Sequence, residues 1–174
     1  GKCIGYLLGS ENQGMKVMFH MMNHVGMATG LQGAAYASAA YLLALNYARE
    51  RIQGRSLENF FDHSAPSVAI IQHPDVRRNL LKMKAYVDGM RSFFYYCATI
   101  GMQEKLGETE EDRAFSGDLF SLFTPIIKDY LSVRGHEVCI QAIQVHGGAG
   151  YTQEYTVEQY ARDCKICSIY EGCS

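Results

Sequence analysis

Helical periodicity that continues from about Met15 to Arg51 constrains the fold more than any other feature of the sequence. Apolar side chains recur there at positions i, i+3, i+4 and i+7, which places them on a broad face of one long helix. Small residues dominate the middle of the stretch and would let another helix approach closely, and Gly54 closes the element. The apolar positions are Val17, Met18, Met21, Met22, Val25, Leu31, Ala34, Ala35, Ala39, Leu42, Leu43 and Leu45, and glycines stand at 26, 30 and 33.

A second helix is predicted to begin at Pro74, because proline is favourable in the first turn of a helix and Asp75 is favourable at the same end. Its apolar stripe runs through the following 20 or so residues and fades over residues 101–107. The polar segment 108–113 is the clearest loop in the chain. The second element is therefore expected to be a long helix that ends in a tight reversal.

A third helix follows this polar segment, and Gly147 and Gly148 are expected to stop it. Pro125 marks either its true beginning or a kink within it. A fourth helix is predicted from about Thr156 or Val157 to Ile169. Because no long segment alternates with period 2, the sequence predicts an all-α fold, an antiparallel four-helix bundle with short connections.

The first 14 residues do not share the helical pattern. The apolar run from Cys3 to Leu8 is interpreted as a short β-strand remnant, followed by a glycine-rich loop. A strand without a partner strand suggests that a β-rich portion precedes it. We therefore expect residues 1–14 to be the end of a preceding β-domain or linker, and residues 15–174 to be a C-terminal bundle domain with its final helix missing.

The composition excludes several functional classes. The net charge is −2, so no basic excess indicates a nucleic acid partner. No apolar run reaches the roughly 20 residues that span a bilayer, and the start lacks the layout of a signal peptide. These features predict a cytoplasmic protein.

Cysteine and histidine offer two possible metal sites. Cys164 and Cys167 form a C-x-x-C pair, but no second pair or suitably spaced histidine accompanies it. His20 and His24 stand four residues apart on the first helix, yet the chain lacks the Glu-x-x-His partner of a di-iron bundle. We expect no metal, and interpret most of the six cysteines as small buried hydrophobic residues.

The C-terminal segment combines a glycine-rich helix end with an acid. Gln144-Val-His146-Gly147-Gly148-Ala-Gly150-Tyr151 leads through a short loop and the fourth helix to Ile169-Tyr170-Glu171-Gly172. By residue type alone, Glu171 is more simply interpreted as a solvated glutamate near a helix end, and a general base is the alternative. The glycines alone indicate a helix stop, and their spacing matches neither a dinucleotide fingerprint nor a P-loop.

This segment resembles the C-terminal signature of the flavin-dependent acyl-CoA dehydrogenases. The resemblance implies that FAD is the cofactor and an acyl-CoA thioester the substrate. It implies that Glu171 removes the α proton while a hydride leaves the β carbon, with Tyr170 and Gly172 beside the substrate. It also implies that the backbone N–H of Glu171 donates to the thioester carbonyl.

Three further consequences of the resemblance concern the helices. Some family members carry the base on the first long helix, at a position that falls on Val25 here, so this chain has no acid there. The arginine of that motif falls on Gly26, which is a departure from the family. Arg51 resembles an arginine that reaches the flavin pyrophosphate of the neighbouring subunit, although the helix end is otherwise an ordinary place for a cation.

The resemblance assigns Gln144, Gly147 and Gly148 to the adenosine-diphosphate part of the flavin, again across a subunit boundary. It implies a homotetramer built as a dimer of dimers, with an electron-transfer flavoprotein as electron acceptor. The segment from His73 to Lys84 is similar to bacterial members of broad specificity or acting on methylthiopropanoyl-CoA. Since the other domains of the family are missing, we expect this segment to be inactive by itself.

Two other classes of function remain open from the residues alone. A non-catalytic helical oligomerisation or interaction module would account for the bundle but not for the Ile-Tyr-Glu-Gly ending. A metal-binding helical bundle would lack its ligands.

Overall fold

The computed structural model describes residues 1–172, apart from the side chains of His20 and Asn23. Four α-helices make up most of this region: α1 (Gly14–Glu50), α2 (Pro74–Leu106), α3 (Glu110–His146) and α4 (Val157–Lys165). Short 3₁₀ turns cover Leu57–Asn59, Ile70–Gln72, Gly147–Tyr151 and Ile166–Ser168. The fold is thus the predicted all-α, antiparallel four-helix bundle.

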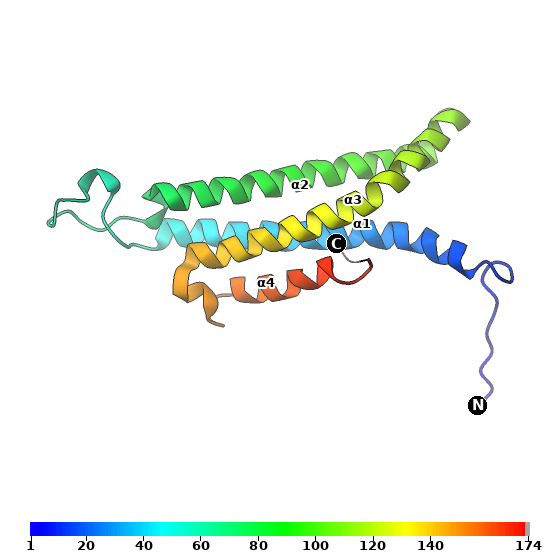
Figure 1. The fold of residues 1–174 in the computed structure, drawn as a ribbon, viewed down its shortest axis with the longest axis horizontal. Helices are drawn as coiled ribbons and strands as arrows, with labels where there is room; N and C mark the ends of the chain where they lie inside the picture. Colours follow the sequence, from blue (N-terminus) through cyan, green and yellow to red (C-terminus); the bar gives the residue numbers. More distant parts are fainter. Residues whose placement is uncertain (173–174) are drawn as a thin grey trace.

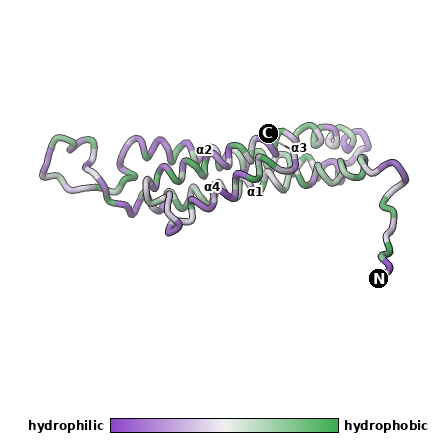
Figure 2. Tube along the Cα trace, turned by 60° about the horizontal axis from the view of Figure 1, so that its bottom comes forward, coloured by the Kyte–Doolittle hydropathy of each residue, from purple (hydrophilic) through white to green (hydrophobic). Residues whose placement is uncertain are grey.

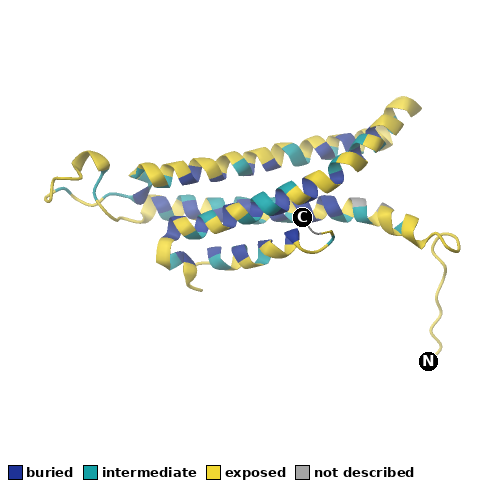
Figure 3. Cartoon of the chain, in the orientation of Figure 1, coloured by how far each residue is buried: buried dark blue, intermediate teal, exposed yellow. Residues whose placement is uncertain are grey.

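Helices α1 and α3 form the centre of the bundle. Helix α2 packs against one side of this pair and α4 against the other, so that α2 and α4 do not touch (Figure 1). Hydrophobic and hydrophilic residues alternate around the helices (Figure 2), and the buried positions form stripes on their inward faces (Figure 3). None of the helices described between residues 1 and 172 has the length and hydrophobicity needed to cross a membrane.

The long helices begin and end where local chemistry favours it. Pro74 starts α2, and Thr109 caps α3 by accepting a hydrogen bond from the Asp112 backbone N–H at 3.0 Å. Acidic residues occupy the first turn of α3, where the helix dipole favours them. Gly147 ends α3 with φ +63°, a conformation that glycine adopts without steric cost.

The predicted strand remnant is wrong for the part of the chain that the structure describes. Residues 3–8 form neither helix nor strand, and the first residues extend away from the bundle (Figure 1). Tyr6 is 93% exposed. An apolar run becomes a strand only when a neighbouring strand takes up its backbone hydrogen bonds, and no such neighbour is present among residues 1–172.

Three predicted boundaries also differ. The polar loop is shorter than expected, because α3 begins at Glu110 once Thr109 has capped it. Pro125 lies inside α3, so the alternative in which it starts the helix is wrong. Helix α4 ends at Lys165 rather than Ile169, and a 3₁₀ turn follows in which Ser168 Oγ donates to the Lys165 carbonyl.

Small residues make the closest contact between α1 and α3. On α1, Ala37, Ala40, Ala44 and Ala48 are fully buried, which agrees with the predicted close approach of another helix. Gly33 on α1 faces Gly135 on α3. A Cβ atom added at Gly135 would lie 2.5 Å from the Gly33 carbonyl oxygen.

This contact predicts opposite effects for two glycine-to-alanine changes in helices. Gly135→Ala should lower the free energy of unfolding by about 1–3 kcal/mol, because the backbones of α1 and α3 must separate. Gly89→Ala on α2 is the matched control: its Cβ would meet no atom within 4 Å, and we expect a gain of about 0.5–1 kcal/mol. Urea unfolding followed by circular dichroism measures both. Equal effects of the two variants would contradict the close crossing.

Candidate functional site

Glu171 lies in a turn that directly follows the last 3₁₀ segment of the chain. Its side chain is half-buried, and its backbone has φ +57°. A residue with a Cβ atom adopts this left-handed conformation at a cost of roughly 1–2 kcal/mol. Gly172 follows with φ +96°, which suits glycine. The turn therefore holds its acid in a strained conformation.

Hydrogen bonds from two different helices hold the turn on either side of Glu171. Tyr170 Oη donates to Gln32 Oε1 on α1 at 2.8 Å. Lys128 Nζ on α3 donates to the carbonyl oxygen of Gly172. The three residues assigned by resemblance to catalysis and substrate binding are thus adjacent and held against the middle of the bundle.

The alternative base position lies on α1. Val25, which the resemblance places at this position, is half-buried and carries no acid. Gly26 is buried against α3, where an added Cβ would lie 3.1 Å from Thr124 Cγ2 and 4.0 Å from Lys128 Cβ. A larger side chain at position 26 would therefore press on α3 near the stem of Lys128.

A pocket of about 360 Å³ at the other end of the bundle brings together three of the predicted cofactor residues. Arg51 enters it from the end of α1, and Gln144 and Gly147 from the end of α3. Gly148 is the next residue, is exposed, and does not line the pocket. An Arg guanidinium, a side-chain amide and an open glycine turn fit a phosphate group, which accepts hydrogen bonds from all three.

His146 is a buried histidine in this pocket that the sequence analysis did not single out. Its ring stacks on Tyr47 with 4.3 Å between centroids, and its Nδ1 donates to the Ala142 carbonyl at 2.8 Å. Burial lowers the pKa of His146, and the hydrogen bond to Ala142 only partly opposes this. The imidazole is therefore neutral at pH 7. The only feature of the sequence that could have indicated His146 as a pocket residue is its position directly before the glycines that end α3.

Gly150 has a structural role next to this pocket. It is buried, and a Cβ at this position would lie 2.7 Å from His146 Cβ and 2.9 Å from the Ile143 carbonyl oxygen. The third glycine of the motif is therefore required by packing of the turn against the end of α3.

The acid-bearing turn and the pocket lie far apart along the bundle. Gln32, which anchors the turn, and Arg51, which lines the pocket, are 19 positions apart along α1 and its C-terminal cap. At 1.5 Å per residue this is about 28 Å. The two groups of predicted residues therefore do not form one site within a single chain.

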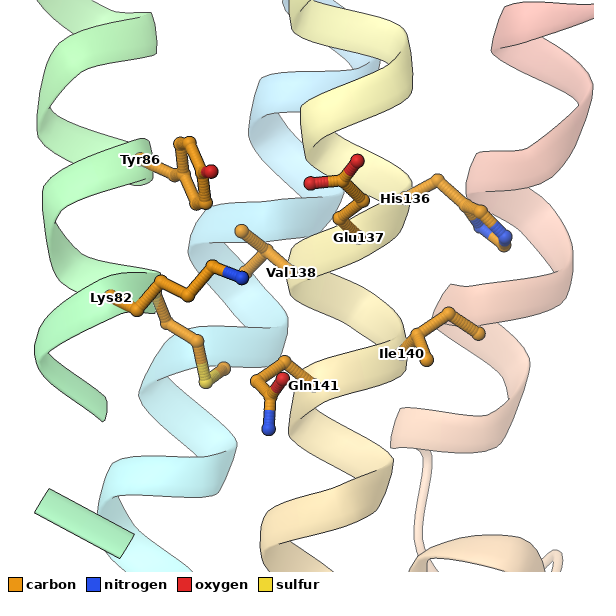
Figure 4. A pocket seen from close by; sticks show the side chains of 8 residues that line it. Lys82, Tyr86, His136, Glu137, Val138, Ile140 and Gln141 are labelled. Carbon is orange, nitrogen blue, oxygen red and sulfur yellow. The ribbon is translucent and has the colours of Figure 1, made fainter. Parts of the chain in front are cut away.

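A second pocket, of about 250 Å³, lies between α2 and α3. Figure 4 shows Lys82, Tyr86, Glu137 and Gln141 around it, while the His136 ring points away towards α4. Burial and the nearby Lys165 lower the pKa of His136. None of the residues predicted to act in catalysis or to bind the cofactor or the substrate lines this pocket.

Four cysteines, Cys97, Cys139, Cys164 and Cys167, are buried, as small hydrophobic residues would be, whereas Cys3 is exposed. A hydrogen bond to Cys139, with burial, raises the pKa of Cys164, and burial raises that of Cys167 to about 11. These thiols are poor nucleophiles. Residues 1–172 contain no group of three His, Cys, Asp or Glu side chains placed to hold a metal. Cys173 and the His20 side chain lie outside the described residues.

Solved structures with this fold define its class. Butyryl-CoA dehydrogenase from Megasphaera elsdenii superimposes with a TM-score of 0.75 and 26% sequence identity, over 95% of this chain and 37% of that one. The bundle is therefore the helical domain of the acyl-CoA dehydrogenase fold. The family model described as "Acyl-CoA dehydrogenase, C-terminal domain" matches residues 12–174, so the chain belongs to the acyl-CoA dehydrogenase family and corresponds to its C-terminal domain.

Curated relatives agree with this assignment. The 3-methylmercaptopropionyl-CoA dehydrogenase of Ruegeria pomeroyi is 43% identical over 97% of the chain, and the broad-specificity linear acyl-CoA dehydrogenase FadE5 of Mycobacterium tuberculosis is 37% identical over the same share. The chain spans 28% of the length of each. The predicted similarity to bacterial members of these two kinds is confirmed.

Proposed function

We propose that this chain is the C-terminal part of an FAD-dependent acyl-CoA dehydrogenase that introduces a double bond between the α and β carbons of an acyl-CoA. The observation that carries the proposal is the strained, doubly anchored turn that presents Glu171. Strained backbone is kept where the surrounding structure determines it, and it concentrates at functional sites. A merely solvated glutamate would not require this arrangement.

Glu171 accepts the α proton of the thioester in this mechanism. The proton is weakly acidic, so negative charge that develops on the thioester carbonyl must be stabilised by hydrogen-bond donors. Within residues 1–172, no backbone carbonyl accepts a hydrogen bond from the backbone N–H of Glu171, and we propose that this N–H donates to the thioester carbonyl. Tyr170 and Gly172 flank the substrate beside the base. Bound FAD supplies the acceptor for the hydride that leaves the β carbon.

The pocket at the far end of the bundle serves the flavin of a neighbouring subunit. Arg51 would pair with the pyrophosphate, and Gln144, Gly147 and Gly148 would hold the adenosine-diphosphate part. The separation of about 28 Å along α1 supports this assignment, because the ribityl chain that links pyrophosphate and flavin ring is far too short to bridge it. We infer a homo-oligomer, a dimer of dimers, in which each site draws on two chains.

Electron-transfer flavoprotein is the proposed electron acceptor. One relative, 28% identical over 96% of the chain, is the caffeyl-CoA reductase–Etf complex subunit CarC of Acetobacterium woodii. This relative covers the same helical region as the chain and supports a partner of that kind.

The proposal is tested by mixing the flavin-loaded, full-length enzyme with acyl-CoA under anaerobic conditions. We expect butyryl-CoA or 3-methylmercaptopropionyl-CoA to bleach the absorbance of oxidised flavin and to yield a product lighter by two hydrogens. Reduction by dithionite is the control, because it shows that the bound flavin is able to accept electrons. Flavin that dithionite bleaches but no acyl-CoA bleaches would contradict the proposal and favour a non-catalytic oligomerisation module.

A further inference from the structure

Lys128 is a cation inside the bundle. It belongs to α3, and only 5% of its surface is exposed. Its Nζ donates to the Gly172 carbonyl, and no carboxylate forms an ion pair with it within residues 1–172. Burial of a charge is unfavourable unless its hydrogen bonds compensate, and an apolar side chain of similar volume is often as stable or more so. General stabilisation therefore does not account for Lys128.

The stem of Lys128 lies at the crossing of α1 and α3. Gly26 on α1 is its neighbour there, and a Cβ at position 26 would lie 4.0 Å from Lys128 Cβ, an ordinary contact, but only 3.1 Å from Thr124 Cγ2. Glycine at position 26 therefore allows α1 to pack against α3 beside Lys128 without pressing on Thr124.

The turn that Lys128 reaches has a second anchor. Gln32 on α1 accepts a hydrogen bond from Tyr170 Oη, one residue before Glu171, while Lys128 binds the carbonyl one residue after it. Glu171 lies between the two with φ +57°. A strained conformation persists only when the surrounding structure holds it in place. The two hydrogen bonds hold the chain on either side of Glu171.

We propose that Lys128 and Gln32 are positioning residues that clamp the Glu171 turn from α3 and α1. The inference rests on the proposed role of Glu171 as the base. Neither residue takes a proton from the substrate. They fix the direction of the carboxylate, and a displacement of about 1 Å at a reacting group can lower a rate roughly 100-fold.

The test uses four variants of the full-length, flavin-loaded enzyme: Lys128→Met, Lys128→Arg, Gln32→Leu and, as a matched control, Lys105→Met at an exposed position of α2. The first measurement is the rate constant of flavin reduction at saturating acyl-CoA, which isolates the chemical step. The second is hydrogen–deuterium exchange at the Ile169 and Tyr170 amides, which bond to the Ile166 carbonyl at 2.9 and 3.1 Å.

Lys128→Met should lower the reduction rate about 10- to 100-fold with a smaller change in KM, and should accelerate exchange of the two amides about tenfold. In Lys128→Arg, the reduction rate and the exchange rate should lie closer to the wild-type values than in Lys128→Met, since arginine keeps the charge and the hydrogen-bond donors. Gln32→Leu should lower the reduction rate and accelerate exchange by smaller factors than Lys128→Met. Lys105→Met should match the wild type in both measurements.

Wild-type rate and exchange in folded Lys128→Met would overturn the clamp. If Lys128→Met does not fold, a wild-type rate in Gln32→Leu would overturn it instead. Glu171→Gln, measured in parallel, separates this outcome from failure of the proposed function. If Glu171→Gln abolishes flavin reduction while the clamp variants do not change it, only the clamp is wrong. If Glu171→Gln retains the wild-type rate, this result contradicts both the proposed function and the proposed clamp.

Discussion

Glu171→Gln in the full-length, flavin-loaded enzyme is expected to lower turnover by about two to four orders of magnitude, the range that a general base contributes. Glutamine has nearly the same shape as glutamate and retains a hydrogen-bonding oxygen, but its neutral amide cannot take up the α proton. The half-buried turn keeps its anchors at Gln32 and Lys128, because neither contact involves the Glu171 side chain. Binding of flavin and acyl-CoA should therefore remain.

Steady-state turnover and titration of the flavin spectrum with acyl-CoA measure these two effects separately. Glu154→Gln is the matched control, because Glu154 is exposed in the connection between α3 and α4. It should behave as the wild type. Turnover that survives in Glu171→Gln would mean that the base lies elsewhere, and Val25 offers no acid to replace it. A loss of flavin or substrate binding together with turnover would instead assign Glu171 to binding.

Local signals in the sequence predicted the helices well. Proline and aspartate at 74 and 75 mark the start of α2, and Gly147 ends α3 as expected. These features depend on residues within one turn of each other, and capping chemistry acts over that range. The number of helices and their order along the chain could be predicted because these local signals mark where helices begin and end.

The wrong predictions concern segments whose structure depends on distant partners or on a competing local interaction. The apolar run at residues 3–8 has the composition of a strand, but a strand depends on a partner strand, and none of the described residues provides it. Proline favours a helix start, which makes Pro125 a candidate, yet Thr109 caps α3 further upstream. Periodicity also extended α4 past Lys165, where the Ser168 hydroxyl favours a tighter turn.

The candidate site could be predicted only in part. The resemblance identified Glu171, Arg51 and Gln144, but neither Lys128 nor Gln32 has a local pattern that distinguishes it from other polar residues on a helix. Their contacts with the turn span 44 and 138 residues of sequence. Contacts of this kind follow from how α1, α3 and the C-terminal turn pack, and no rule based on short spacing contains that information.

Mixed oligomers of Glu171→Gln and Arg51→Met chains should recover activity that neither variant has alone at limiting FAD. On the proposed role of Arg51, loss of its guanidinium removes a charged contact to the pyrophosphate and should weaken flavin binding about 10- to 100-fold. If each site draws on two chains, as proposed, one site of a mixed dimer combines Glu171 from one chain with Arg51 from the other and is intact. Its partner site lacks both. Co-expression with two affinity tags, followed by turnover assays of the doubly purified oligomer, measures the recovery.

The expected activity rises to at most about half that of the wild type, because one of the two equivalent sites in each mixed dimer of the proposed dimer of dimers is complete. If Arg51 instead served the Glu171 turn of its own chain, every site in the mixed dimer would carry one defect and activity would stay absent. Dimers that carry Glu171→Gln in both chains, purified with the same two tags, control for the purification. The geometry favours recovery, since about 28 Å of α1 separates Gln32, the anchor of the turn, from Arg51. On the proposed roles, one flavin would reach both the Glu171 turn and Arg51 only when these belong to different chains.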